Sequence, residues 1–132
     1  MTAQLEVLRG TTDGDGAAVV DTVNPICGEV LAVFVDGAAL TDSANLVLQP
    51  VLVKAAGADE LGESIVNHAD IGNATIDKVY PRRLATDAAG AALEVATGQN
   101  VAIPFVVPGA KLRATISAGG ATKAFTVTIV WR

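Results

Sequence analysis

Apolar and polar residues alternate most regularly near the end of the chain, in the segment 110–132. Every second residue is apolar in two successive runs, which is the period of a β-strand with one buried face. Between the runs, 117–121 contains two adjacent glycines, which tolerate the positive φ of a tight turn. The pattern predicts a C-terminal β-hairpin whose apolar side chains need a second layer: Leu112, Ala114 and Ile116, then Phe125, Val127, Ile129 and Trp131.

The other extended runs are short and are separated by turns rich in Gly, Pro, Asn and Asp. We expect strands near 4–9, 17–21, 26–36, 45–54, 64–66, 74–79 and 101–107. The first two flank a turn of glycines and aspartates and are predicted to pair as an N-terminal hairpin. Because no helical pattern alternates with the strands, the predicted fold class is all-β, an antiparallel β-sandwich or flattened barrel of about eight short strands.

Some segments depart from this simple alternation. Pro50 and Pro104 each remove a backbone donor from a strand, which favours an edge or a bulge. The alanine-rich segment 84–97 contains a glycine and is predicted as a long loop with at most a helical turn. The run 26–36 is apolar on both faces, so we expect the opposite sheet to cover one face and a loop or a neighbouring subunit the other. The two predicted faces are Val30, Ala32 and Phe34, and Leu31, Val33 and Val35.

A length of 132 residues fits one domain, 1–132, in which 1–25 forms an N-terminal hairpin or an arm. Hydrophobic residues make up 51% of the chain, but many are alanines that bury little area, and aromatic residues make up 4%. We expect Phe34, Phe105, Phe125 and Trp131 to supply the large core side chains, each contributing about 2 to 3 kcal/mol when buried. Such a core is thin, and association with other copies or a partner would supplement it.

The net charge of −5 and the pI near 4.6 argue against a nucleic-acid partner, because phosphate binding needs a surplus of Lys and Arg. No apolar stretch approaches the ~18 residues of a membrane helix, and the first residues lack the pattern of a secretion signal. We therefore expect a soluble protein made in the cytoplasm, with no membrane partner. Cys27 is the only cysteine, which excludes an intrachain disulfide and predicts a small buried hydrophobe.

Few residues suggest chemistry. Asp13 and Asp15 lie among glycines as in a calcium loop, but the closing Glu is missing, so a plain turn is the favoured interpretation. His68 has no nucleophile or second histidine in a local motif, which favours a solvated loop histidine over a small hydrolase. Glu60 and Glu63 could form a glycosidase pair, yet no sugar-stacking aromatic residues accompany them. We expect no catalysis, no cofactor and no metal.

The most distinctive polar group is the basic cluster, which comprises Lys78, Tyr80, Pro81, Arg82 and Arg83. It concentrates positive charge on an otherwise acidic chain, and the proline holds the preceding tyrosine in extended geometry. Tyr and Arg anchor protein interfaces through a large amphipathic area and forked donors. We predict that the basic cluster binds a partner; the alternative is a solvated basic loop.

Taken together, these features resemble a group of small tailed-bacteriophage virion proteins that are found among head genes. The resemblance covers about three quarters of the chain. Its most specific piece is Tyr-Pro-Arg followed by Asp-Ala-Ala-Gly. The sequence departs from the group at Glu63, where an Asp is common, and at Pro104, which interrupts a strand. The matching segments are 28–36, 45–48, 59–62, 79–82, 87–93 and 111–131.

The resemblance implies a capsid decoration or cement protein without catalytic activity. Its partners would be the major capsid protein and other copies of itself, as trimers, and its place would be the virion surface. Within the virion, the alternative is a neck or tail component. Outside it, the alternative is a carbohydrate-binding β-sandwich module, for which Tyr80 and Trp131 are the candidate stacking residues.

Overall fold

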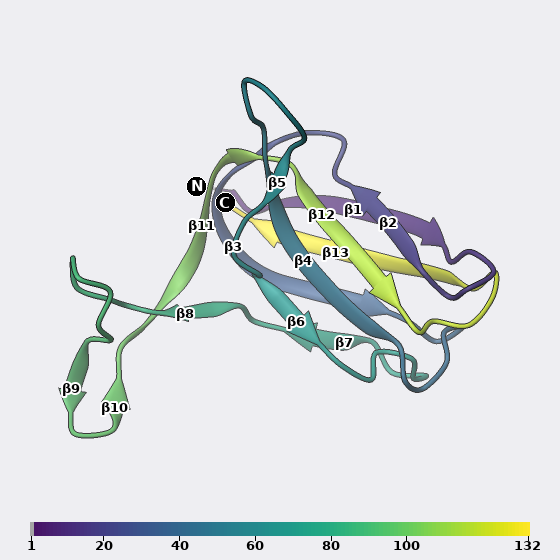
Figure 1. The fold of residues 1–132 in the computed structure, drawn as a ribbon. Helices are drawn as coiled ribbons and strands as arrows, with labels where there is room; N and C mark the ends of the chain where they lie inside the picture. Colours follow the sequence, from purple (N-terminus) through teal and green to yellow (C-terminus); the bar gives the residue numbers. More distant parts are fainter. Residues whose placement is uncertain (1) are drawn as a thin grey trace.

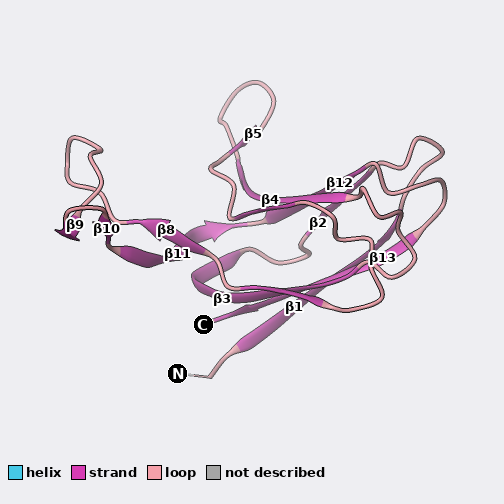
Figure 2. Ribbon diagram, turned by 90° about the horizontal axis from the view of Figure 1, so that it is seen from below, coloured by secondary structure: helices cyan, strands magenta, loops and turns pink. Residues whose placement is uncertain are grey.

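The computed structural model describes residues 2–132, which form two antiparallel sheets and contain no helix. Figure 2 shows the two sheets as two layers, which confirms the predicted antiparallel β-sandwich. The first sheet has the strand order β1 (Gln4–Thr11), β13 (Ala124–Trp131), β3 (Ile26–Asp36), β11 (Ala102–Ala110) and β8 (Arg82–Leu84), and β7 (Asp77–Val79) also pairs with β3.

The second sheet has the order β2 (Ala18–Asp21), β12 (Leu112–Ser117), β4 (Asn45–Leu52) and β5 (Glu60–Leu61), and β6 (Val66–His68) also pairs with β4. A separate small hairpin consists of β9 (Glu94–Ala96) and β10 (Gln99–Asn100). The strands lie close to the predicted positions, with more of them than expected because several are only two or three residues long.

Both predicted hairpins are wrong in their pairing. β12 pairs with β2 and β4, whereas β13 pairs with β1 and β3, so the glycine segment between β12 and β13 crosses from one sheet to the other. The connection between β1 and β2 crosses in the same way, which also places both strands of the segment 1–25 in the sandwich. Alternation fixes which face of a strand is buried, but it does not fix the neighbour with which that strand pairs.

Hydrogen bonds between loops explain why these connections cross. The backbone N–H of Gly119 donates to the carbonyl oxygen of Gly16 (2.9 Å), and the N–H of Thr41 donates to the carbonyl oxygen of Gly119 (3.1 Å). The hydroxyl groups of Thr12 and Thr41 donate to the carbonyl oxygens of Gly120 and Ala118. The glycine segment therefore joins loops of both sheets instead of forming an isolated turn.

The core between the sheets is mainly aliphatic. Phe105 and Phe125 are buried as expected, but Phe34 is only half-buried and Trp131 packs at the margin of the core. Buried side chains from the two sheets face one another across the interior. Among the fully buried members are Leu8, Val33, Val35, Val127 and Ile129 from the first sheet, and Leu46, Leu48, Leu112, Ala114 and Ile116 from the second.

A bulge in β3 changes the predicted faces of this strand. The register with β13 shifts so that Trp131 lies opposite Val30 while Val130 lies opposite Ala32. The bulge brings Val30 into the core cluster together with Val33 and Val35, although the predicted alternation placed it on the other face. The outer face of the first sheet stays partly exposed: Phe34 is half-buried between Thr128 of β13 and Lys78 of β7, and Leu5 and Val7 of β1, on the other side of β13, are exposed.

The start of β3 depends on a glycine. Gly28 has a φ of +149°, and a Cβ atom at this position would overlap the carbonyl oxygen of Arg132. That same carbonyl accepts a 2.8 Å hydrogen bond from the N–H of Glu29. We predict that Gly28→Ala lowers the free energy of unfolding by about 2 kcal/mol or more, because it combines backbone strain with a steric clash.

Gly14→Ala is the matched control, since a Cβ atom there would meet no neighbouring atom. We expect it to change the free energy of unfolding by less than about 0.5 kcal/mol. Urea unfolding of both variants is the measurement. Equal stabilities for the two variants would show that the close approach at Gly28 does not constrain the strand.

Candidate functional site

A two-stranded arm leaves the sandwich at the end where β3 begins (Figure 1). We call residues 82–104 the arm: β8 and the first part of β11 form its stem, and the β9–β10 hairpin forms its tip. Side chains described between residues 86 and 100 are all exposed. The segment 84–97 was predicted as a loop with at most a helical turn, but it contains the β9 strand and a Thr86–Ala92 bridge instead.

The arm begins at a junction of three strand segments. β11 pairs with β3 from Phe105 onward but with β8 through Ala102–Pro104, so Pro104 lies where the partner changes. β7 pairs with β3 just beyond this point. This position explains the proline: a residue without an N–H donor is tolerated where one ladder ends and another begins.

The structure places Tyr80, Pro81, Arg82 and Arg83 of the predicted basic cluster at the root of the arm, whereas Lys78 lies further from it, beside the last part of β3. Lys78 lies on β7 opposite Phe34, Arg82 and Arg83 lie on β8, and all three cations are exposed. Tyr80, between the two strands, is 61% exposed. Pro81 differs from the other members of the basic cluster because it is buried, so it packs the start of the arm against the sandwich.

Two of the three cations of the cluster have no carboxylate partner among residues 2–132. The guanidinium of Arg82 donates to the carbonyl oxygen of Pro81 (2.8 Å), and Lys78 forms no salt bridge with a described residue. Arg83 lies 3.9 Å from the carboxylate of Glu63, a long and exposed ion pair of small energetic weight. The root therefore presents positive charge and hydrogen-bond donors to solvent.

The arm also exposes apolar side chains that were not predicted as part of a site. Leu84 is 48% exposed, Leu93 45% and Ile103 39%. An isolated two-stranded ribbon has no second layer against which to bury such residues. The combination of exposed apolar area and positive charge is typical of a surface that contacts another protein. A strand at Ile103 was predicted from the sequence, but the pattern of apolar residues does not show which face of that strand stays uncovered in the fold.

The residues considered for chemistry do not converge. His68 lies on β6, not in a loop as predicted, and its Nε2 atom is 3.7 Å from the carboxylate of Asp77. The carboxylate of Asp13 accepts hydrogen bonds from the N–H groups of Ala17 and Asp15, and these bonds lower its pKa. Asp13 thus stabilises a turn. Within residues 2–132, no group of His, Cys, Asp and Glu side chains has the arrangement of a metal site.

Cys27 corrects another prediction, because its side chain is exposed and not buried. Its neighbour Ile26 takes the buried position at the start of β3, and the alternation of the strand turns Cys27 to the outside.

In the described part of the chain, no helix is long and apolar enough to span a membrane.

A groove of about 550 Å³ lies at the corner between β11 and β12 and includes none of the basic cluster. No aromatic residue lines it. At its wall, the guanidinium of Arg113 donates to both carboxylate oxygens of Asp21, at 2.7 and 2.9 Å. These hydrogen bonds lower the pKa of Asp21. The pair joins β2 to β12 and has a structural role.

No protein-family model and no curated protein matches the chain. Among solved structures, the chain is similar to PirA, with 16% identity and a TM-score of 0.39 over 95% of this chain and 93% of that one. It is also similar to a structure of the infectious bursal disease virus Gx strain, with 14% identity and a TM-score of 0.33 over 96% of this chain and 32% of that one.

A third similar structure is an exo-β-1,3-galactanase from Phanerochaete chrysosporium with galactose. Its identity is 14% and its TM-score 0.32, over 98% of this chain and 29% of that one. The chain thus spans about a third of the viral and galactanase chains. At TM-scores below 0.5, none of these likenesses bears on function.

Residues 86–100 of the arm add little to the stability of the sandwich, because their described side chains are exposed. We predict that replacing residues 86–100 with Asn-Gly changes the free energy of unfolding by less than about 1 kcal/mol. The N–H of Ala85 already donates to the carbonyl oxygen of Val101 (2.8 Å), so a two-residue turn can close the stem there. By contrast, Ile129→Ala, in the core, should cost about 3 kcal/mol. Urea unfolding measures both, and a deletion as costly as the core variant would contradict this prediction.

The Asp21–Arg113 pair gives the sandwich a defined acid dependence. The folded state lowers the pKa of Asp21 below its ordinary value of 3.8, so the pair stabilises the fold above that pH and its contribution is lost as pH falls through the lowered pKa. Because both groups are partly exposed, Asp21→Asn should cost only about 0.5 kcal/mol at neutral pH. We expect the difference from the unsubstituted protein to vanish on acidification, as followed by urea unfolding. A difference that is constant with pH would exclude this role.

Proposed function

We propose that the protein is a structural component of a bacteriophage virion that binds the outside of the major capsid shell and stabilises it. The observation that carries this proposal is the arm, which projects from the sandwich with exposed Tyr80, Arg82 and Arg83 at its root and uncovered apolar side chains along its length. The most specific segments of the resemblance to tailed-phage head proteins, 79–82 and 87–93, fall within this region.

The physical properties of the chain suit an adhesive role on a symmetric particle. A sandwich closed by aliphatic packing needs no cofactor to present a projecting contact element. Each contact of this size is weak, but many copies on a regular shell add their effects when neighbours bind together. The partner surface that fits the root is one with exposed carboxylates, because arginine binds them with paired donors.

The alternative of a carbohydrate-binding module finds less support in the structure. Sugar binding by a sandwich module relies on exposed aromatic side chains. Of the two candidates, Trp131 packs against the core and only Tyr80 is well exposed. The groove at the corner of β11 and β12 has no aromatic lining.

Replacing the two arginines of the root tests the capsid contact. We predict that Arg82→Ala/Arg83→Ala lowers the occupancy of purified capsids at sub-saturating concentration by about tenfold or more, since an interfacial arginine commonly contributes more than 1 kcal/mol. Quantitative mass spectrometry of the washed particles gives the copies bound per capsid. Arg9→Ala/Lys111→Ala is the matched control, because it removes two other exposed cations and the same charge.

Unchanged occupancy in the arginine variant would remove the root from the interface. The same measurement on native particles distinguishes a position on the capsid shell from a position in the neck or tail. Shell decoration requires on the order of hundreds of copies, whereas a neck or tail component requires about a dozen. The lower number would overturn the proposed location.

A further inference from the structure

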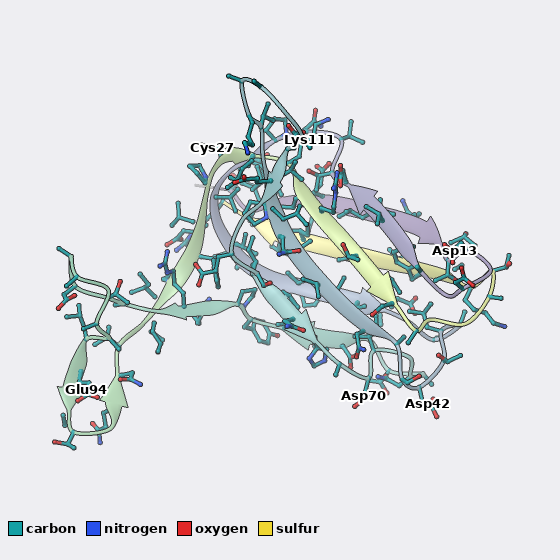
Figure 3. All side chains as sticks on the ribbon, in the orientation of Figure 1. Asp13, Cys27, Asp42, Asp70, Glu94 and Lys111 are labelled. Atoms are coloured by element: carbon teal, nitrogen blue, oxygen red, sulfur yellow. The ribbon has the colours of Figure 1, made fainter. Side chains whose placement is uncertain are left out.

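The first sheet ends in an uncovered strand at β1. This strand has eight residues and pairs only with β13, so one side of its backbone has no neighbouring strand in the described part of the chain. It runs along the margin of the sandwich toward the turn that contains Asp13 (Figure 3). Residues 4–9 of this strand include no proline and no glycine. We call the side of residues 4–9 that faces away from β13 the open edge.

The register with β13 shows which backbone groups point outward at the open edge. The N–H of Thr12 donates to the carbonyl oxygen of Lys123 (2.9 Å), and this pair continues the register of β1 with β13. In an antiparallel ladder, only every second pair of residues is hydrogen-bonded. The even-numbered residues of β1 therefore bond to β13, whereas the N–H and C=O groups of Leu5, Val7 and Arg9 face away from it. No loop or turn of the described chain supplies a backbone partner for these groups.

The other free strand edges of the two sheets are short or contain prolines. β2, β6, β7 and β8 have three or four residues each, and β5 has two. β11 is longer and pairs with one strand at a time, but Pro104 and Pro108 interrupt it. Short edges and prolines are means by which β-proteins prevent unwanted strand pairing. Of the described strands, β1 alone combines a long free edge with the absence of proline, which suits it to accept another strand.

Apolar side chains accompany the open edge on the outer face of the first sheet. Leu5 is 64% exposed and Val7 is 41% exposed. The same face continues on the neighbouring strands with Val130 and Phe34, which are partly exposed. Residues 4–9 carry one acidic and one basic side chain, so the open edge is neutral on a chain of net charge −5. Two such edges do not repel each other through their net charge, and each can cover apolar area of the other.

We propose that two copies of this chain form a dimer in which their β1 strands pair antiparallel along the open edge. A two-fold axis relates two identical antiparallel strands, so each outward N–H of one copy meets a carbonyl oxygen of the other. The occupant is a second copy because it carries a free strand edge of equal length, neutral charge and matching outer face. The first sheets of the two copies then form one continuous sheet. This inference goes beyond the proposed capsid binding, because the dimer needs no capsid.

Side-chain pairing favours a two-fold axis at Val7. Hydrogen-bonded pairs between the copies join odd-numbered residues, since the backbones of these residues face outward. An axis at Val7 places this residue opposite its own copy and Leu5 opposite Arg9, whose aliphatic stem covers the leucine. An axis at Glu6 would place two carboxylates directly opposite each other, which is destabilising.

Sedimentation velocity over a concentration series tests whether the dimer forms. We expect a monomer–dimer equilibrium with a dissociation constant on the order of micromolar, because one pair of strands buries less than the ~1,600 Å² of a standard interface. Leu5→Lys/Val7→Lys should weaken the dimer by about tenfold or more, since it places like charges across the axis and removes apolar area. Val53→Lys/Ile76→Lys is the matched control, because it gives two other exposed apolar positions the same charge.

Disulfide cross-linking tests the register in a Cys27→Ser background. Cys27 is exposed near the start of β3, so its thiol has to be removed first (Figure 3). Opposed residues of a hydrogen-bonded pair have Cα atoms about 5.5 Å apart, which a disulfide can span. Val7→Cys should therefore cross-link to its own copy under mild oxidation. Leu5→Cys and Arg9→Cys should cross-link when the two variants are mixed and not when either is alone.

Val106→Cys is the control for cross-linking, because this position is exposed on β11, away from the open edge, and should give no dimer. Circular dichroism verifies folding, and the cysteine variants, which leave the lysines out, keep the test decisive if the lysine variant does not fold. A monomer at every concentration, a trimer, a lysine variant that dimerises normally, or absent cross-linking at Val7 would each overturn the proposal. Failure here is distinct from failure of capsid binding, because these experiments contain no capsid.

Discussion

The structure depends on the packing of two aliphatic sheet faces, because no disulfide can form from a single cysteine and no large aromatic cluster is available. Burial of side chains such as Val33, Leu48, Ile116 and Ile129 supplies most of the folding free energy. Consecutive strands contribute to opposite sheets at several points, so the polypeptide crosses the sandwich repeatedly at its ends. At one end, these crossings bring four loops together, and their mutual hydrogen bonds make that end a fixed surface.

At the other end of the sandwich, packing between the two sheets no longer covers every strand. β11 leaves β3 at Pro104 and pairs with β8, and the ribbon that they form extends beyond the second sheet. Side chains on the ribbon therefore lack the opposite layer that covers the rest of the fold. The molecule therefore combines a two-sheet body with a projecting arm whose stem strand β8 carries exposed Arg82 and Arg83.

Strand positions could be predicted from the sequence because alternation of period two is a local property. The alternation in 112–116 and 125–131 correctly identified two strands with one buried face each. Their partners could not be predicted, because the glycines at 119 and 120 permit a hairpin as readily as a crossing, and the choice depends on hydrogen bonds to distant loops. The bulge in β3 and the exposure of Cys27 likewise depend on register with β13 and β11.

For the candidate site, the informative sequence signal was the local concentration of Lys and Arg. Three cations close together in the sequence of an acidic chain identified the region, and the structure places two of them on β8 at the root of the arm and the third on β7 beside β3. The arm was not predicted because the alanines and glycine in 84–97 have weak preferences for strand structure. In addition, the strands of its hairpin are only three and two residues long, which leaves little alternation to detect.

The order of the strands has a consequence for how the protein acquires its fold. β13 lies between β1 and β3 in one sheet, and β12 lies between β2 and β4 in the other, so the two latest strands in the chain are central to both sheets. During synthesis, the earlier strands therefore wait without their main partners, and neither sheet can be completed until these two segments leave the ribosome. Contacts between such distant parts of a chain form slowly, so the aliphatic strands of the nascent polypeptide stay exposed to chaperones and to other nascent copies until β12 and β13 have emerged.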